Sequence, residues 1–443
     1  MPDPIRVDPR TAAAAAAVPF DANADEVSAW WASLSQPARD RLIAEHPPAL
    51  GNLNGIPAIV RDTINTAVMN DDLARVADVA GRLDVPVDAV MKSPPQYGLS
   101  NDDVVRYRNA GQAKSGLDHD RGSDPGNPRP VMLWAYDPVA FNGQGRAAIA
   151  IGNPDTSEDI AVVVPGAGSS VAGGWLSAGH NAAINLYDRT VVAQPDVDTS
   201  VIAWMGYDAP DGFDDQRIGT PWLAREGGAR LAQDVNGLWA TRDSATAPHL
   251  SVIGHSYGAT TVADAFAGSG MRANDAILLG TPGTDLARRA ADFQLDGGEV
   301  YVGAASTDPV SWIGASGSVP NKLNEWLGHP FGRYAGLGID PAGDGFGSVR
   351  FKAEVPGAHA LNLRDHSHYY DVGGEALRSM THIVTGDGDA LSREGLVARG
   401  RRQPHFTTPR ELTIPGLGRI RLPHIDTRIP GTPAYIDPEA ARQ

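Results

Sequence analysis

The chain has 443 residues, of which 42% are hydrophobic and 20% are charged, and its formal net charge is −16. This composition is that of a folded protein long enough for two or three domains, and its negative charge disfavours nucleic acid and anionic membrane surfaces as partners. The chain contains no cysteine, which excludes disulfides, thiol nucleophiles, cysteine-ligated zinc and iron–sulfur clusters.

Residues 1–125 are expected to form a helical region. Between residues 24 and 115 the apolar side chains recur with a helical period, and the pair Trp30-Trp31 is interpreted as core. The alanine run that ends at Val18 is too short and too weakly apolar for a convincing signal peptide, and no window approaches about 18 consecutive apolar residues. We therefore expect no transmembrane segment and a cytoplasmic location, with export by a non-classical route as the alternative.

A polar segment rich in glycine and proline, residues 116–130, is expected to link this region to the next domain. Its Asp118, Asp120 and Asp124 superficially resemble a calcium-binding loop, but Gly122 stands where that loop requires a ligand. The spacing therefore disfavours a metal site, and no metal is predicted for the chain.

Eight short apolar runs follow the linker, and helix-length segments separate them from the third run onward. The runs are residues 131–138, 146–152, 160–166, 200–206, 250–256, 276–283, 299–306 and 349–355, and the predicted helices are 181–192, 221–242, 260–268 and 286–292. Apolar runs that alternate with helices are typical of a parallel sheet buried on both faces, while the first two runs can pair as a hairpin. Residues 126–390 are therefore predicted to form an α/β-hydrolase fold, with a mostly parallel sheet of about eight strands.

The fifth run leads into Gly254-His255-Ser256-Tyr257-Gly258, which matches the pattern G-x-S-x-G. A nucleophilic serine at a tight strand-to-helix turn adopts a strained conformation and requires small neighbours, which the two glycines supply. An apolar strand precedes the motif and a small-residue helix follows it, so Ser256 is predicted to be a nucleophile rather than a structural turn residue. His255 is expected to have a packing role, because neighbouring side chains diverge on such a turn.

A serine nucleophile in this fold takes its acid from after the seventh strand and its base from after the eighth. Asp308 follows the seventh run and is the predicted acid, although an Asp-Pro pair can also simply initiate a turn. Asp285, which follows the sixth run, is the alternative. Among the histidines that follow the eighth run, spacing alone leaves both His366 and His368 open as the base.

Stabilisation of the developing oxyanion requires two backbone N–H groups. One is expected from Tyr257, which follows the nucleophile at the start of a helix. The other is expected from the glycine-rich loop after the third run, residues 165–174, where Ala167 is the first choice and Gly168 the second.

Several motifs occur together in this order: VVVPGAGSSV, WMGYDAP, VIGHSYGATT, STDPV and DHSHYYD. Together they resemble an actinobacterial family of α/β-hydrolases of unassigned function that is common in mycobacteria, and the likeness spans roughly residues 28–386. The H-S-x-Y frame of that family matches residues 366–369. The resemblance therefore implies that His366 is the base, and it leaves the extra histidine, His368, as a supporting or substitute base.

Two further segments are expected to affect access to the predicted active site and the assembly of the chain into oligomers. Residues 311–348, rich in glycine and aromatic residues, are longer than a connection needs and are predicted to roof the site as a cap-like insertion. Residues 391–443 resemble a short hairpin followed by an extended proline-rich arm, which packs on its own domain or joins a homo-oligomer.

These patterns predict a serine esterase or lipase-like enzyme that acts on small-molecule or lipid esters through Ser256, His366 and Asp308 and an acyl-enzyme. The mechanism needs no metal ion or organic cofactor. A serine peptidase or an acyltransferase with the same three residues is one alternative. Another is a non-catalytic binding protein with the hydrolase fold, in which the terminal segments occlude the site.

Overall fold

The computed structural model describes residues 18–179, 181–242, 247–305, 308–313, 337–343, 345–355 and 364–398. Beyond these it describes the backbone of four short strands: β9 (His405–Thr407), β10 (Glu411–Ile414), β11 (Gly418–Arg421) and β12 (Asp426–Arg428). β10 pairs with β11 and β9 pairs with β12, both antiparallel. Most of the predicted cap-like insertion, residues 311–348, and the rest of the C-terminal arm lie outside the described residues.

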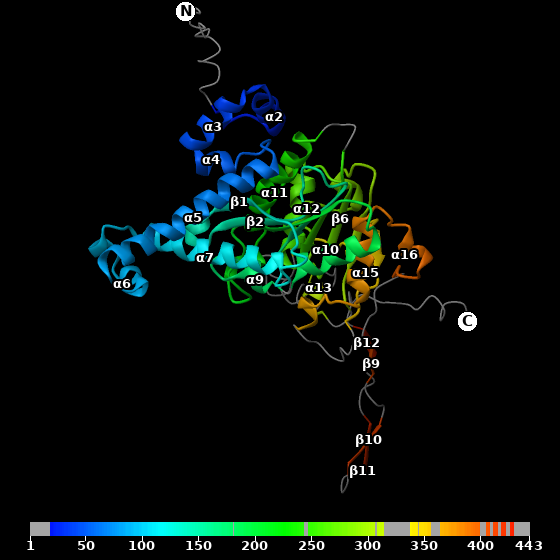
Figure 1. Cartoon of the computed structure of the whole chain (residues 1–443). Coiled ribbons are helices and arrows are strands. Elements are labelled where there is room, and N and C mark those ends of the chain that lie inside the picture. The colour runs from blue at the N-terminus through cyan, green and yellow to red at the C-terminus, as the bar shows by residue number, and fades with distance from the viewer. Residues whose placement is uncertain are drawn as a thin grey trace, which may run out of the picture.

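The N-terminal region is helical (Figure 1). Its elements are α2 (Ala24–Ser33), α3 (Gln36–Glu45), α4 (Pro47–Gly51), α5 (Ala58–Leu83), α6 (Val87–Lys92), the 3₁₀ helix η1 (Pro94–Tyr97) and α7 (Asn101–Arg121). The side chains of Asn23 and Glu26 cap the start of α2 reciprocally. Trp31 is buried in a small apolar cluster with Val27 and Leu42, while Trp30 packs on its edge. None of the helices in the described ranges is both long and apolar enough to cross a membrane.

The predicted linker begins later than its composition suggests, because α7 continues to Arg121. Asp118 forms ion pairs with Lys114 and Arg121 along the helix surface, which favours the helical conformation over a loop. Gly116 packs so closely against Leu176 that a Cβ atom there would lie 2.7 Å from it. Gly116, the first residue of the predicted linker, therefore lies inside a helix, at a position where the helix packs closely against Leu176.

An eight-stranded sheet forms the centre of the protein. Its strands are β1 (Val131–Asp137), β2 (Arg146–Ile151), β3 (Asp159–Val164), β4 (Thr199–Met205), β5 (His249–His255), β6 (Asp275–Leu279), β7 (Val300–Gly303) and β8 (Val349–Phe351). They lie in the order β1-β2-β4-β3-β5-β6-β7-β8. β2 pairs antiparallel with β1 and with β4, and every other pair is parallel. The fold class predicted from the sequence is confirmed.

Helices cover both faces of the sheet (Figure 1). The pair α10 (Ala182–Ala193) and α15 (Glu375–Val384) packs on one face, and the pair α11 (Trp222–Ala240) and α12 (Tyr257–Ser269) packs on the other. The shorter elements are α8 (Ala140–Gly143), α9 (Trp175–Ala178), η2 (Gln216–Gly219), η4 (Ala290–Phe293), α13 (Val310–Ile313), η5 (Asp365–Ser367) and α16 (Ala390–Arg393). Because both faces are covered, the central strands are buried along nearly their whole length and are mostly apolar.

The helix predicted over residues 286–292 is not formed. Thr284 makes a β-bridge with Ile339, which holds the chain extended just before this segment. The Asp292 carboxylate then accepts hydrogen bonds from the backbone N–H groups of Arg288 and Arg289. These bonds satisfy the backbone locally, so that only the short η4 forms.

Polar contacts fix the N-terminal helices to the sheet. Asp155, in the loop between β2 and β3, accepts hydrogen bonds from the N–H groups of Ala58 and Ile59 at the start of α5. Buried Asp234 on α11 forms an ion pair with Arg146 of β2, with an Nη2–Oδ2 distance of 2.7 Å, and also accepts a hydrogen bond from Asn54. The helical region is therefore anchored to the sheet by charge-assisted hydrogen bonds at two places.

Asp264, on α12, should make the stability of the fold depend on pH. Its side chain is 1% exposed and one carboxylate oxygen has no hydrogen-bond partner. Burial raises the pKa of Asp264 to about 7, against about 3.9 in an unfolded chain. The folded state therefore holds a proton that the unfolded state releases, and the corresponding stability is lost as pH rises from about 4 through 7.

Replacing Asp264 by asparagine should consequently stabilise the protein more at pH 8 than at pH 5, by about 2–3 kcal/mol in the free energy of unfolding. Urea unfolding of both proteins at the two pH values measures this difference. The exposed Asp78→Asn variant on α5 serves as the matched control. An Asp264→Asn effect of equal size at both pH values would contradict this origin of the pH dependence.

Candidate active site

Ser256 lies at the turn between β5 and α12. Its backbone has φ 58° and ψ −129°, a conformation that is strained for a residue with a side chain. A Cβ atom at Gly254 would lie 2.5 Å from the Cα of Ala259, and one at Gly258 would collide with the carbonyl oxygen of Pro165. The two glycines of the motif are therefore needed for the close approach of β5, α12 and the loop after β3.

Asp308 and His366 meet beyond the carboxyl ends of β7 and β8. The Nδ1 atom of His366 lies 2.8 Å from Oδ2 of Asp308, and both side chains are buried. The Tyr369 hydroxyl donates to the same Oδ2 atom over 2.6 Å, and the Val310 N–H donates to Oδ1 over 2.9 Å. Burial alone would raise the pKa of Asp308, but the His366 charge and these hydrogen bonds outweigh it, so the pKa lies below its ordinary value.

Gly280, at the end of β6, makes room for this pair. Its φ is 51°, and a Cβ atom there would lie 2.5 Å from Oδ2 of Asp308 and 2.9 Å from Nδ1 of His366. A side chain at this position would separate the carboxylate from the imidazole. Gly280 could not be identified from the sequence, because its importance depends on two residues that lie far along the chain.

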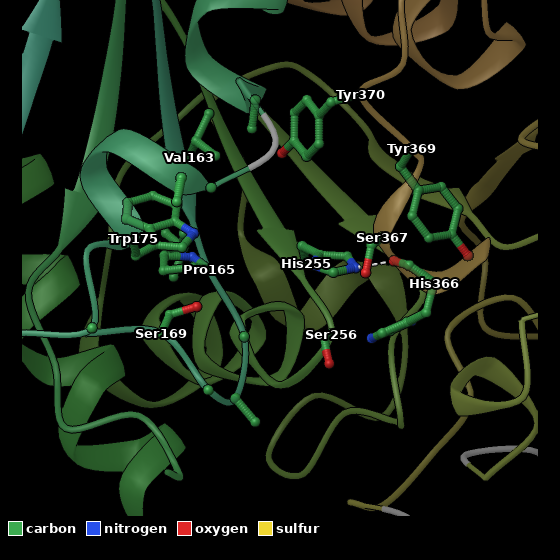
Figure 2. A pocket seen from close by; sticks show the side chains of 18 of the residues that line it. Val163, Pro165, Ser169, Trp175, His255, Ser256, His366, Ser367, Tyr369 and Tyr370 are labelled. Atoms are coloured by element: carbon green, nitrogen blue, oxygen red, sulfur yellow. Dashed lines mark hydrogen bonds between the residues drawn. The ribbon is translucent and has the colours of Figure 1, made fainter. Parts of the chain in front are cut away.

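Ser256 and His366 line one cavity of about 300 Å³. Figure 2 shows both side chains facing the same space, with Ser169 and Trp175 on the far side of Ser256 from His366. The Nε2 atom of His366 is buried and has no hydrogen-bond partner. The imidazole therefore keeps a free nitrogen for a proton, while its other nitrogen is held by Asp308.

His255 does not compete with His366 for the serine. Its Nε2 atom donates a hydrogen bond to the backbone carbonyl of His366, and the centroids of the two imidazole rings lie 4.5 Å apart. The motif's own histidine thus contacts the backbone that carries the predicted base.

The loop after β3 lies directly against the predicted nucleophile. A Cβ atom at Gly166 would lie 2.5 Å from the Cβ of Ser256, so the predicted loop approaches the serine at Gly166, a residue that was not among the sequence-based candidates. Ala167 and Gly168 both line the cavity. The N–H of Gly168, however, donates to the carbonyl oxygen of Pro210 over 2.7 Å, so the second choice for the oxyanion site is already engaged. Tyr257 begins α12, where backbone N–H groups have no partner within the helix.

The two alternative site residues lie elsewhere. Asp285 forms an ion pair with Arg225, with an Nη2–Oδ2 distance of 2.6 Å. The Nδ1 atom of His368 donates a hydrogen bond to the carbonyl oxygen of Arg364. His368 is not among the residues that line the cavity. Among the described residues, no group of three histidine, aspartate or glutamate side chains is arranged to hold a metal ion.

Tyr369 holds the Asp308 carboxylate in place, a contact that could not be predicted from the sequence. Its hydroxyl donates to Asp308 and accepts from the N–H of Ala305 over 3.0 Å. A Tyr369→Phe variant lacks the hydroxyl, so Asp308 loses a hydrogen-bond donor and the N–H of Ala305 loses an acceptor. We expect kcat for any reaction that uses the Asp308–His366 pair to fall about tenfold with little change in KM, and the free energy of unfolding to fall by about 1–3 kcal/mol.

Steady-state kinetics and urea unfolding measure these two effects. Tyr301→Phe on β7, another buried tyrosine, is the matched control because its hydroxyl is not bonded to Asp308. A Tyr369→Phe variant with unchanged kcat would show that the hydroxyl does not help to set the Asp308–His366 geometry.

Comparison with known proteins gives the following similarities. A family model described as alpha/beta hydrolase matches residues 138–317. An uncharacterized protein of Mycobacterium tuberculosis is 57% identical over 426 residues, which are 96% of this chain and 63% of that protein. The chain thus spans somewhat less than two thirds of that relative's length. An uncharacterized protein of Mycobacterium bovis is 32% identical over 208 residues, 45% of this chain and 75% of that protein.

Among solved structures, carboxyl esterase 2 from the fungus Tuber melanosporum matches with a TM-score of 0.31 and 11% identity, over 59% of this chain and 88% of that chain.

Proposed function

Because the chain belongs to a family of alpha/beta hydrolases with members in mycobacteria, we propose that it is a serine hydrolase that cleaves carboxylic esters. The observation that carries this proposal is the convergence of three groups. Ser256 sits at a strained strand-to-helix turn, it shares a cavity with His366, and His366 is held by buried Asp308. This is the arrangement that nucleophilic acyl transfer requires.

In the proposed reaction, Nε2 of His366 removes the proton from the Ser256 hydroxyl as Oγ attacks the ester carbonyl carbon. The N–H groups of Tyr257 and Ala167 stabilise the negative oxygen of the tetrahedral intermediate. The carbon–oxygen bond to the alcohol then breaks, and His366 donates its proton to the departing oxygen. Water, deprotonated by His366, attacks the acyl-enzyme in the same way and releases the acid and Ser256.

Asp308 supports each of these proton transfers without taking a proton itself. Its carboxylate accepts the hydrogen bond from Nδ1 of His366, which leaves Nε2 as the nitrogen that exchanges protons with Ser256 and the alcohol. The lowered pKa of Asp308 keeps it ionised, so it also stabilises the imidazolium that forms in the transition state.

The size of the cavity is sufficient for a small ester. About 300 Å³ is at the lower end of the range of small-molecule pockets, and it suits one short acyl group next to Ser256. A peptidase or an acyltransferase could use the same three residues, and these remain the alternatives to the proposed esterase.

A substrate panel on the full chain tests the proposal. The panel combines p-nitrophenyl esters from acetate to palmitate with peptide p-nitroanilides, and an added alcohol reports acyl transfer. We expect the highest kcat/KM for the short esters and no cleavage of the anilides. Cleavage of the anilides alone, or accumulation of the transfer product in place of free acid, would contradict the esterase assignment.

A further inference from the structure

One polar group of the cavity has no role in the mechanism proposed above. Tyr370 lines the same cavity as Ser256, and its side chain is 5% exposed. Its hydroxyl oxygen is buried and has no hydrogen-bond partner. Its backbone is held in place, because the Asn185 side chain donates to the Tyr370 carbonyl oxygen over 2.9 Å. The phenol is thus a fixed, unsatisfied polar group beside the candidate active site.

An unsatisfied hydroxyl of this kind destabilises the protein. Burying a hydroxyl without a partner costs about 1–3 kcal/mol, and buried polar side chains are satisfied in the large majority of cases. Phenylalanine would fill the same space without this cost. Burial also raises the pKa of Tyr370 far above its ordinary value, so the hydroxyl keeps its proton and can donate it to an oxygen atom of a ligand.

The proposed mechanism determines how an ester is oriented in the cavity. His366 must protonate the departing alcohol, so the alcohol part lies on the His366 side of Ser256. The acyl part then extends away from His366, toward the side of the cavity that Trp175 and Ser169 border (Figure 2), and Tyr370 lines the same cavity. Because Tyr370 lines this cavity of about 300 Å³, its phenol is one of the groups that an acyl chain bound there can meet.

We propose, on the basis of the esterase function above, that Tyr370 is a specificity-determining residue that hydrogen-bonds an oxygen on the acyl chain. The preferred substrates are then esters of short hydroxy acids rather than of plain fatty acids. Apolar acyl chains of the same length would leave the phenol unsatisfied, and the binding energy of one hydrogen bond would be lost.

The test compares p-nitrophenyl butyrate with p-nitrophenyl 2-hydroxybutyrate and 3-hydroxybutyrate, on the full chain. For the wild type we expect kcat/KM to be at least about tenfold higher for one of the hydroxy esters. In Tyr370→Phe that advantage should disappear, while kcat/KM for butyrate stays within about twofold. Tyr187→Phe on α10, a tyrosine outside the set that lines the cavity, is the matched control and should keep the preference.

The possible outcomes separate the two proposals. If the wild type hydrolyses butyrate and reacts with a fluorophosphonate but shows no preference for either hydroxy ester, the role of Tyr370 is wrong and the esterase function stands. The same conclusion follows if Tyr370→Phe lowers kcat/KM equally for all three esters. If none of the esters is hydrolysed and no labelling occurs, the esterase proposal is contradicted, and the inference that rests on it falls as well.

Discussion

Replacing Ser256 by alanine is expected to abolish covalent labelling by a fluorophosphonate and to lower kcat for ester hydrolysis by about 10⁴-fold or more. The substitution removes only Oγ, so the strained turn and the packing of β5 against α12 remain. No other group in the proposed mechanism can form the acyl-enzyme. Labelling followed by mass spectrometry, together with ester kinetics on the same preparations, measures both effects.

Ser169→Ala is the matched control for this experiment, because Ser169 also lines the cavity but lies across it from His366. This variant should label at the wild-type rate. Undiminished labelling of Ser256→Ala would show that another residue is the nucleophile. A wild type that neither labels nor hydrolyses esters would favour the non-catalytic binding protein over the proposed enzyme.

The second large effect is expected from His366. In His366→Ala no group remains to accept the Ser256 proton, and kcat should fall by about 10⁴-fold or more. His368→Ala should change kcat less than about twofold, because its ring lies next to the carbonyl oxygen of Arg364 and outside the residues lining the cavity. The two variants differ by two positions in one short segment, so each serves as the control for the other.

Folding must be checked for His366→Ala, since the side chain is buried and bonded to Asp308. A thermal melt shows whether the variant retains the wild-type fold, and His366→Gln provides a second variant of closer size. If His368→Ala were inactive while a folded His366→Ala kept its activity, the assignment of the base would be wrong. Equal losses in both variants would show that the segment, rather than one imidazole, is what catalysis needs.

Much of the fold could be predicted because its strands are buried on both faces. Short, mostly apolar runs, as in β3 and β5, have few other interpretations when helix-length segments separate them. The ends of helices and linkers were harder to predict wherever tertiary contacts decide the local structure. The composition of residues 116–121 indicates a loop, but the packing of Gly116 against Leu176 keeps these residues helical.

The same distinction applies to the site. That Asp308 meets a histidine from the segment after the eighth strand could be predicted, because neighbouring parallel strands bring their carboxyl ends to one edge of the sheet. The choice between His366 and His368 could not be made from spacing, since both follow the same strand. The contacts of Tyr369 and Gly280 with Asp308 depend on atoms brought together from separate strands, and no local pattern in the sequence marks them.

Five consecutive residues, 366–370, carry the predicted base, the hydroxyl that holds Asp308 and the phenol assigned to the acyl chain. The segment is tethered at both ends, by His255 to the carbonyl of His366 and by Asn185 to the carbonyl of Tyr370. Any change that moves Tyr370 will therefore also move the imidazole. Tyr370→Phe keeps both backbone tethers and should leave the imidazole in place, whereas substitutions at Tyr370 that shift this segment should lower turnover as well as change acyl preference. Ser169 and Trp175 lie on a separate stretch of chain, so changes there do not act on these two tethers.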